Sequence, residues 1–442
     1  MEQLIVQGGR TLSGRVAISG SKNASLPILA ASILAEEPVV LRNVPNLIDV
    51  EIITQLLMSL GISVLEREDG SLRLETVDPA QCIAGYELVS RMRASICVLG
   101  PLIGKRGYAR VALPGGCRIG DRPVDLHLHG LRALGAEIRV EGGDIIAEAD
   151  RLVGTKINLA GPCGSTVTGT CNVMSAATLA RGVTLIESAA CEPEVADLGR
   201  FLIGMGARIE GLGTNQLVIE GVEELLGTDH TVIPDRIEAA TLAIAAAITR
   251  SRIELEQFPF GDLCEVLSGL RSIGVEIEQN GAIARIEGRN PLRAADLVAR
   301  PYPGIPTDTQ AQFTALLTLV PGLNTVTDAV FPNRFMHVPE LRRLGANIRC
   351  AGGTATIRGT RRLTGTDVVV SDLRAGAALV LAGLAAEGTS IIHRIDHLDR
   401  GYERLDEKLN RLGAEIQRVE DRQSFASDTI PWTTASETAA AA

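Results

Sequence analysis

The amino-acid sequence predicts an α/β protein of two domains, in which buried helices lie inside and sheets lie outside. Three observations support this prediction. The 442 residues are more than one ordinary core accommodates. The chain is 45% hydrophobic but only 3% aromatic, so Ala, Leu, Ile and Val must fill the cores, as suits α/β layers. A pattern of helices and strands also recurs six times, at intervals of 68–74 residues.

The recurring pattern contains an amphipathic helix that ends at a glycine and is followed by a strand. One copy reads LRALGAEI from Leu131, with apolar residues at helical spacing before the glycine and alternation after it. Glycine often ends a helix because it adopts the left-handed conformation without strain. The six predicted helix-ending glycines are Gly61, Gly135, Gly206, Gly274, Gly345 and Gly413.

A second helix occurs in every repeat and is apolar on all sides, as in RAGAALVLAGLAA from Arg374. A helix that is apolar all round is buried all round. Three such helices would therefore fill each domain, with the sheets covering them. The predicted ranges are 21–37, 91–105, 168–181, 235–250, 308–320 and 372–387.

The polar residues of these buried helices gather at the helix N-termini. Free N–H groups and partial positive charge make a helix N-terminus favourable for anions. Lys22, Arg93, Arg374 and the loop with Arg400 carry more basic groups than helix capping needs, which predicts an anion-binding cleft. Two readings stay open for the fourth helix, because its Asp235, Arg236 and Glu238 could equally be ordinary caps and cap-stabilising ion pairs.

Overall charge and cysteine content exclude several classes of function. The net charge of -10 argues against nucleic acid or an anionic membrane surface as a partner, so an anionic substrate must be held locally. No apolar run is long enough to predict a membrane span. The N-terminus lacks signal-peptide features and the eight cysteines form no CxxC pair, which together predict a cytoplasmic location with reduced thiols and no zinc cluster. Residues 421–442 are rich in Ser, Thr and Ala and predict a disordered tail.

The least ordinary stretch is LPGGCRIGDRPVDLHLH, which begins at Leu113. Its Pro-Gly-Gly turn predicts that Cys117 lies at the tip of a loop, where Arg118 and Arg122 would favour the thiolate. Pro123 can open the helix that follows. A loop cysteine without a role is the competing reading. The His127/His129 pair predicts no metal site, because rings two residues apart on a helix face apart.

Seven motifs of the sequence are specific enough to indicate a family. They are GSKNASLPILAA at Gly20, RMRAS at Arg91, PGGCRIGDRPVDLH at Pro114, YPGIPTDTQAQ at Tyr302, FPNRFMHVPELRRLGA at Phe331, DLRAGAAL at Asp372 and DRGYERL at Asp399. Together they resemble the UDP-N-acetylglucosamine 1-carboxyvinyltransferases, enolpyruvyl transferases of the EPSP synthase superfamily, and the resemblance covers residues 1 to about 419. It implies an inside-out α/β barrel of two domains, each of three βαβαββ repeats. Residues 22–232 would form the domain with the Cys117 loop, and residues 1–21 plus 233–420 the domain with the Asp308 and Arg400 motifs.

The resemblance implies transfer of the enolpyruvyl group of phosphoenolpyruvate to the 3′-hydroxyl of UDP-N-acetylglucosamine, with release of phosphate. This reaction begins peptidoglycan synthesis, and thus serves cell-wall growth, cell shape and division, and it is the target of fosfomycin. The implied partners are these two substrates, with no nucleic acid or membrane, and a monomer or weak homo-oligomer. No metal or organic cofactor is implied.

The same resemblance assigns roles to residues. Cys117 would donate the proton to C3 of phosphoenolpyruvate, and Asp308 would be the base for the sugar hydroxyl. Asp372 would orient Lys22 or Arg400, or simply cap its helix. Lys22, Arg122, Arg334, Arg374 and Arg400 would hold phosphate and carboxylate, Asn23 would position the sugar, and the nucleotide sugar would contact Arg93, Arg122, Pro123, Val124, Asp125, Leu126, Asp308 and Val330.

Three departures from the family pattern concern the acceptor rather than the chemistry. Gly164 stands where the family usually has a lysine, and Thr168 where it has a glycine, in a region implied to hold the nucleotide. Cys97 replaces a frequent tryptophan, and Ile48 an occasional basic residue. Two alternatives therefore stay open: a paralogue that uses another uridine nucleotide, and a catalytically silent regulator that binds a sugar nucleotide.

Overall fold

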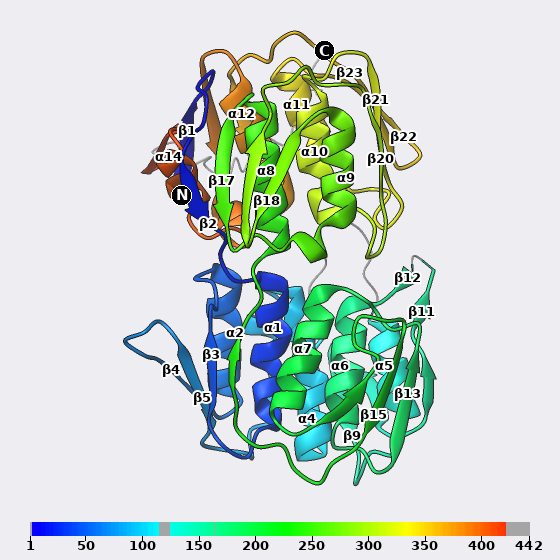
Figure 1. Cartoon of the computed structure of the whole chain (residues 1–442). Coiled ribbons are helices and arrows are strands. Elements are labelled where there is room, and N and C mark those ends of the chain that lie inside the picture. Colours follow the sequence, from blue (N-terminus) through cyan, green and yellow to red (C-terminus); the bar gives the residue numbers. More distant parts are fainter. Residues whose placement is uncertain (1, 115–123, 163, 421–442) are drawn as a thin grey trace, which may run out of the picture.

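The computed structural model describes residues 2–114, 124–162 and 164–420. In this part of the chain, six four-stranded sheets surround two sets of central helices (Figure 1). Every sheet has the same plan: an edge strand runs parallel to the second strand, and the third and fourth strands are antiparallel to their neighbours. The chain thus repeats one unit of the form βαβαββ, as the sequence predicts.

The lower half of Figure 1 holds three of these units. The first contains β16 (Asp229–Thr231), α1 (Lys22–Ala31), β3 (Val39–Arg42), α2 (Ile48–Ser59), β4 (Ile62–Glu66) and β5 (Leu72–Thr76). The second contains β6 (Ile83–Ala84), α3 (Tyr86–Val89), α4 (Leu99–Arg106), β7 (Tyr108–Ala112), α5 (Asp125–Ala133), β8 (Glu137–Glu141) and β9 (Asp144–Glu148). The third contains β10 (Lys156–Asn158), α6 (Val167–Ala177), β13 (Val183–Glu187), α7 (Pro193–Gly204), β14 (Arg208–Glu210) and β15 (Gln216–Glu220), with the short pair β11 (Ala160–Gly161) and β12 (Gly164–Ser165) inserted.

The upper half holds three further units. The fourth contains β2 (Arg15–Ala17), α8 (Arg236–Ile248), β17 (Arg252–Glu256), α9 (Cys264–Ile273), β18 (Glu276–Asn280) and β19 (Ile283–Glu287). The fifth contains β20 (Asp296–Ala299), α10 (Gln310–Leu317), β21 (Leu323–Asp328), α11 (Val338–Arg343), β22 (Asn347–Ala351) and β23 (Thr354–Arg358). The sixth contains β24 (Asp367–Val369), α12 (Leu373–Ala385), β25 (Thr389–His393), α13 (Asp396–Asp399), α14 (Leu405–Arg411), β26 (Glu415–Glu420) and β1 (Glu2–Gln7).

Short 3₁₀ segments adjoin three of the central helices and the outer helix α9. They are η1 (Ser32–Leu34), η2 (Arg93–Val98), η3 (Phe260–Asp262) and η4 (Thr307–Thr309). The prediction of one continuous helix over 91–105 is therefore wrong at its start, because η2 occupies 93–98 and α4 begins only at Leu99. Asp308 likewise lies in η4, before the first residue of α10.

The six predicted helix-ending glycines are confirmed by their backbone conformation. Gly61, Gly135, Gly206, Gly274, Gly345 and Gly413 all have positive φ, between 77° and 107°. Gly61 directly precedes β4, and each of the other five lies two residues before the edge strand that follows it. A side chain at these positions would strain the backbone, which explains why the repeat keeps glycine there.

The buried helices form two separate hydrophobic cores. One core draws its residues from 24–232, and the other from 4–18 together with 239–416. All 13 residues of α8 are buried, as expected for a helix that is apolar on every side. We propose that the two cores mark the predicted domains, 22–232 and 1–21 with 233–420. The predicted tail at 421–442 lies outside the described residues.

The chain passes between the two halves twice, along neighbouring segments. Ser21 donates its backbone N–H to the carbonyl of Ile233 at 2.7 Å, and Asp235 donates to the carbonyl of Ser19 at 2.8 Å. Gly20 is required here, because a Cβ at this position would lie 1.6 Å from the carbonyl oxygen of Asn43.

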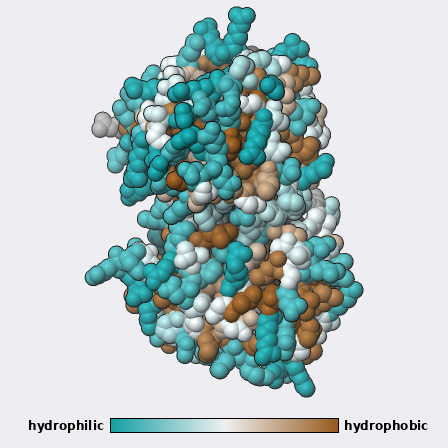
Figure 2. Space-filling view, in the orientation of Figure 1, coloured by the Kyte–Doolittle hydropathy of each residue, from teal (hydrophilic) through white to brown (hydrophobic). Residues whose placement is uncertain are grey.

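The surface differs between the two halves. Figure 2 shows that the visible face of the upper half is largely hydrophilic, whereas apolar side chains are exposed near the junction and on the lower half. None of the described helices has the length and apolar character that crossing a bilayer needs.

Candidate functional site

The candidate site lies where the starts of three central helices from both halves meet. Lys22 and Asn23 begin α1, whose N-cap Ser21 accepts a hydrogen bond from the backbone of Ala24. Asp308 immediately precedes α10, and Arg374 lies in the first turn of α12. Because helix starts concentrate N–H groups and positive potential, this junction favours anions.

Asp308 is the centre of a charged cluster. Arg334 Nη1 lies 2.7 Å from its Oδ1, and Arg374 Nη2 lies 2.9 Å from its Oδ2. Asn23 of the other half donates its side-chain amide to Oδ2 at 3.4 Å. Burial alone would raise the pKa of the Asp308 carboxyl, but the two arginines outweigh burial and hold this pKa well below its usual range. The carboxylate is therefore ionised and able to accept a proton.

Arg374 is enclosed between Asp308 and an aromatic ring. Its guanidinium carbon lies 5.2 Å from the ring centroid of Tyr402, and only 1% of its side chain is exposed. Its Nε and Nη1 have no hydrogen-bond acceptor among the residues that the structure describes. A buried guanidinium with donors still available is suited to bind a carboxylate or a phosphate.

A second charged cluster joins the two halves. Asp49, in the first turn of α2, lies 2.7 Å from Lys22 Nζ and 2.8 Å from Arg400 Nε. Burial lowers the pKa of Lys22, and the charges of Arg374 and Arg400 lower it further, while Asp49 opposes both effects. Lys22, Asp49 and Arg400 are contributed by α1, α2 and the segment after α13.

Six of the predicted residues thus come together: Lys22, Asn23, Asp308, Arg334, Arg374 and Arg400. They account for the predicted base and most of the predicted anion-binding cations. Cys117, Arg122 and Pro123 lie outside the described residues.

Asp372 caps helix α12, which is the second of the two roles predicted for it. Its carboxylate accepts the backbone N–H groups of Arg374 and Ala375 at 2.9 and 3.1 Å. The carboxylate that contacts both Lys22 and Arg400 is Asp49 instead. The interpretation that Asp372 orients these cations is therefore not supported.

The other described residues that are predicted to contact the nucleotide sugar come from both halves. Arg93 begins η2. Burial lowers the pKa of His127 in α5 to about 3, and the charge of Arg93 contributes to the same shift. Val124 precedes α5, Asp125 is its first residue and is exposed, and Leu126 follows. Val330 donates its backbone N–H to Asp328 at 3.0 Å.

His127 itself is held in the core as a neutral ring. The side-chain amide of Asn172 lies 2.8 Å from its Nδ1, and Thr168 Oγ1 lies 3.2 Å from its Nε2. In residues 2–114, 124–162 and 164–420, no group of three His, Cys, Asp or Glu side chains is arranged to hold a metal ion.

At the start of α8, the fourth central helix, the polar residues act as a helix cap and as ion-pair partners, which is one of the two predicted readings. Asp235 caps α8 by accepting from the backbone of Ile237 and Glu238. Arg236 pairs with Glu194 of α7 at 2.9 Å, a buried contact between the two halves. Glu238 pairs with Lys408 at 2.6 Å. Each of these three side chains is therefore engaged in a helix cap or an ion pair.

The departure at Gly164 has a local structural reason. Gly164 has φ of 107°, a conformation that side chains other than glycine rarely adopt. A Cβ there would also lie 3.0 Å from the ring of Pro301 in the other half. A lysine would therefore be strained in this arrangement.

Asp49, Glu194 and Tyr402 were not singled out from the sequence. An acidic residue in the first turn of a helix usually only complements the helix dipole. In the sequence, Asp49 cannot be distinguished from such a residue. The partners of these residues are distant in the sequence, so no local signal could have found them.

Three comparisons relate this chain to known proteins. The profile of the family described as EPSP synthase (3-phosphoshikimate 1-carboxyvinyltransferase) matches residues 6–421. Proteins named UDP-N-acetylglucosamine 1-carboxyvinyltransferase are 53% identical in Methylacidiphilum infernorum and 52% identical in Akkermansia muciniphila; each match covers 95% of this chain and 99% of the relative.

Solved structures with this fold include the enolpyruvyl transferase NikO from Streptomyces tendae. It is 26% identical with a TM-score of 0.85, covering 95% of this chain and 99% of that one. An EPSP synthase from Acinetobacter baumannii, at 19% identity and a TM-score of 0.74, covers 95% of this chain and 100% of its own, and shares the fold.

Proposed function

The chain belongs to the EPSP synthase family of enolpyruvyl transferases, and we propose that it transfers the enolpyruvyl group of phosphoenolpyruvate to the 3′-hydroxyl of UDP-N-acetylglucosamine. The observation that carries this proposal is the pairing of ionised Asp308 with Arg334 and Arg374, close to Lys22 and Arg400, which share Asp49. Full-length relatives that are 50–53% identical bear the name of this activity.

In the proposed mechanism, Asp308 removes the proton of the sugar hydroxyl, whose oxygen then bonds to C2 of phosphoenolpyruvate. Cys117 gives its thiol proton to C3, which yields a tetrahedral adduct. Loss of a proton from C3, returned to the Cys117 thiolate, restores the double bond and breaks the bond between C2 and the phosphate oxygen. The departing phosphate takes up the proton that Asp308 holds, so both residues return to their starting states. The cations hold the phosphate and carboxylate throughout.

The paired arginines also regulate the base in this proposal. As long as Arg334 and Arg374 contact Asp308, its proton affinity is low. A bound phosphoenolpyruvate competes for these guanidinium groups, which weakens their hold on the carboxylate and raises its pKa. The base thus gains strength only when the second substrate is in place.

By this proposal the protein acts in the cytoplasm at the first committed step of peptidoglycan synthesis, and so supports cell-wall growth, cell shape and division. The test is phosphate release from phosphoenolpyruvate with UDP-N-acetylglucosamine, UDP-glucose, UMP and shikimate-3-phosphate as separate acceptors. Release with UDP-N-acetylglucosamine alone supports the proposal. Release only with another uridine nucleotide would identify a paralogue, consistent with the departure at Gly164, and no release would indicate a silent binding protein.

Fosfomycin, an epoxide phosphonate, should alkylate Cys117 when UDP-N-acetylglucosamine is present. The predicted thiolate would attack the epoxide while neighbouring cations bind the phosphonate. Peptide mass spectrometry would locate the adduct. Cys264 and Cys350 are exposed thiols of the other half and serve as internal controls that should stay unmodified. Equal labelling of all three cysteines, or an unmodified Cys117, would contradict the assignment.

A further inference from the structure

The segment that carries Arg400 contacts the other half at two points. Arg400 Nε lies 2.8 Å from Asp49 Oδ1. Three residues further on, Glu403 Oε1 accepts the backbone N–H of Asn46 at 3.1 Å. Asn46 and Asp49 lie on either side of the first residue of α2. These two contacts, Arg400 with Asp49 and Glu403 with Asn46, join the two halves and are called the latch below.

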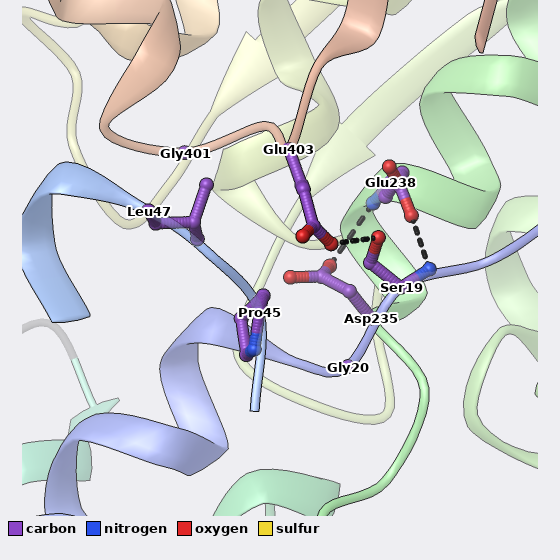
Figure 3. Close-up of a pocket in the computed structure, with 8 residues that line it drawn as sticks. All are labelled: Ser19, Gly20, Pro45, Leu47, Asp235, Glu238, Gly401 and Glu403. Atoms are coloured by element: carbon purple, nitrogen blue, oxygen red, sulfur yellow. Dashed lines mark hydrogen bonds between the residues drawn. The ribbon is translucent and has the colours of Figure 1, made fainter. Parts of the chain in front are cut away.

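Glu403 is also bound to the segment in which the chain passes between the halves. Its Oε2 accepts the hydroxyl proton of Ser19 at 2.6 Å. Figure 3 shows Glu403 directed toward Ser19, beside Asp235 and Glu238, in a pocket between the halves. Lys408 donates to Ser19 Oγ at 2.7 Å and to Glu238 at 2.6 Å, which fixes the Ser19 side chain in turn. The position of Glu403 is therefore tied to the connection between the halves.

Asp49 links the latch to the anion-binding cations. It is only 2% exposed and contacts Lys22 as well as Arg400. Burial would raise the pKa of Asp49, but these two cations outweigh burial and lower it. A carboxylate that stays ionised between Lys22 and Arg400 sets the separation of the two positive charges.

We propose that Asp49 and Glu403 are positioning residues, which place Arg400 beside Lys22 only when the two halves are docked. Neither carboxylate needs to touch a substrate for this role. The inference rests on the proposed function for what Arg400 binds, but the latch itself is a property of the chain alone. It makes completion of the cation set depend on the relative position of the halves.

The first test compares Glu403→Gln with Glu407→Gln in the phosphate-release assay. The amide introduced by Glu403→Gln has a single acceptor oxygen and could accept only one of the two hydrogen bonds. The kcat/KM for phosphoenolpyruvate should therefore fall about tenfold, the size of one hydrogen bond to a charged group. Glu407 is a matched control on α14, since its ion pairs within the described part of the chain are with the exposed Arg404 and Arg411. The loss should fall mainly on KM for phosphoenolpyruvate rather than on KM for the sugar nucleotide. Equal kinetics for both variants would overturn the proposal.

The second test needs no activity and uses hydrogen exchange of the substrate-free protein. Backbone amides in 44–50 and 398–405 should exchange faster in Glu403→Gln and in Asp49→Asn than in Glu407→Gln. Unchanged exchange in both segments would overturn the latch. If the wild-type protein released no phosphate, the proposed function would fail, while this exchange experiment would still decide whether the latch exists.

Discussion

Asp308→Asn should reduce phosphate release by about 10²- to 10⁴-fold, the range that a positioned general base contributes. The substituted amide cannot accept the proton of the sugar hydroxyl, although it keeps the size of the side chain. Asp308→Ala should be equally inactive. Rates at saturating substrate concentrations would measure the effect, because the loss is expected in kcat.

A structural control is needed because Asp308 has two buried guanidinium partners. Asp308→Asn keeps an oxygen that can accept from Arg334, so its thermal unfolding should stay closer to wild type than that of Asp308→Ala. Asp296→Asn is the matched control, since Asp296 is an exposed carboxylate of β20 in the same unit, bonded to Thr325 at 2.7 Å. Near-normal turnover of Asp308→Asn would remove Asp308 from the role of base.

The pH dependence of stability should identify the same group. The folded-state pKa of Asp308 lies below its unfolded value of about 3.9, so the stabilisation is complete above that value. It is lost as the pH falls through the folded pKa. The difference in unfolding free energy between wild type and Asp308→Asn should therefore be constant from about pH 5 to 8 and shrink only below about pH 4. A difference that already declines near neutral pH would contradict this arrangement of charges.

The architecture could be predicted from sequence because its signals are local and repeated. Gly135 and its five equivalents each end a helix for the same conformational reason, and six copies of one weak signal reinforce one another. The central helices were predictable because their sequences are apolar on all sides, and every residue of α8 is indeed buried. The exact start of a central helix was less predictable, since η2 replaces the first turns expected before Leu99.

The site could be predicted only in part, because sequence indicates residue types but not their partners. The motifs identified Asp308, Arg374 and Arg400, yet the carboxylate between Lys22 and Arg400 was sought at Asp372 and lies at Asp49. Both aspartates begin helices, so the local pattern cannot distinguish a cap from a bridging group. That distinction depends on how the two halves dock, which involves residues some 350 positions apart.

Arg374→Met should both inactivate the protein and destabilise it. Methionine can occupy the space beside Tyr402, but it leaves the Asp308 carboxylate with Arg334 as its remaining arginine partner. Removing one member of a buried ion pair costs about 3–5 kcal/mol. Phosphate release should fall at least as far as expected for a lost charge-assisted contact to the substrate, about 10²-fold. Arg285→Met, which breaks surface pairs with Glu254 and Glu278, should change stability by less than about 1 kcal/mol.

The double variant Arg374→Met with Asp308→Asn separates stability from catalysis. If the cost of Arg374→Met arises from an uncompensated carboxylate, neutralising Asp308 should restore part of the lost stability, so the two substitutions should be non-additive in unfolding free energy. Activity should not return, because both the base and an anion-binding cation are then absent. Denaturant unfolding and phosphate release on the same four proteins would measure both quantities. Additive destabilisation would show that Arg374 stabilises the fold through Tyr402 rather than through Asp308, and renewed turnover would show that neither residue is needed for the chemistry.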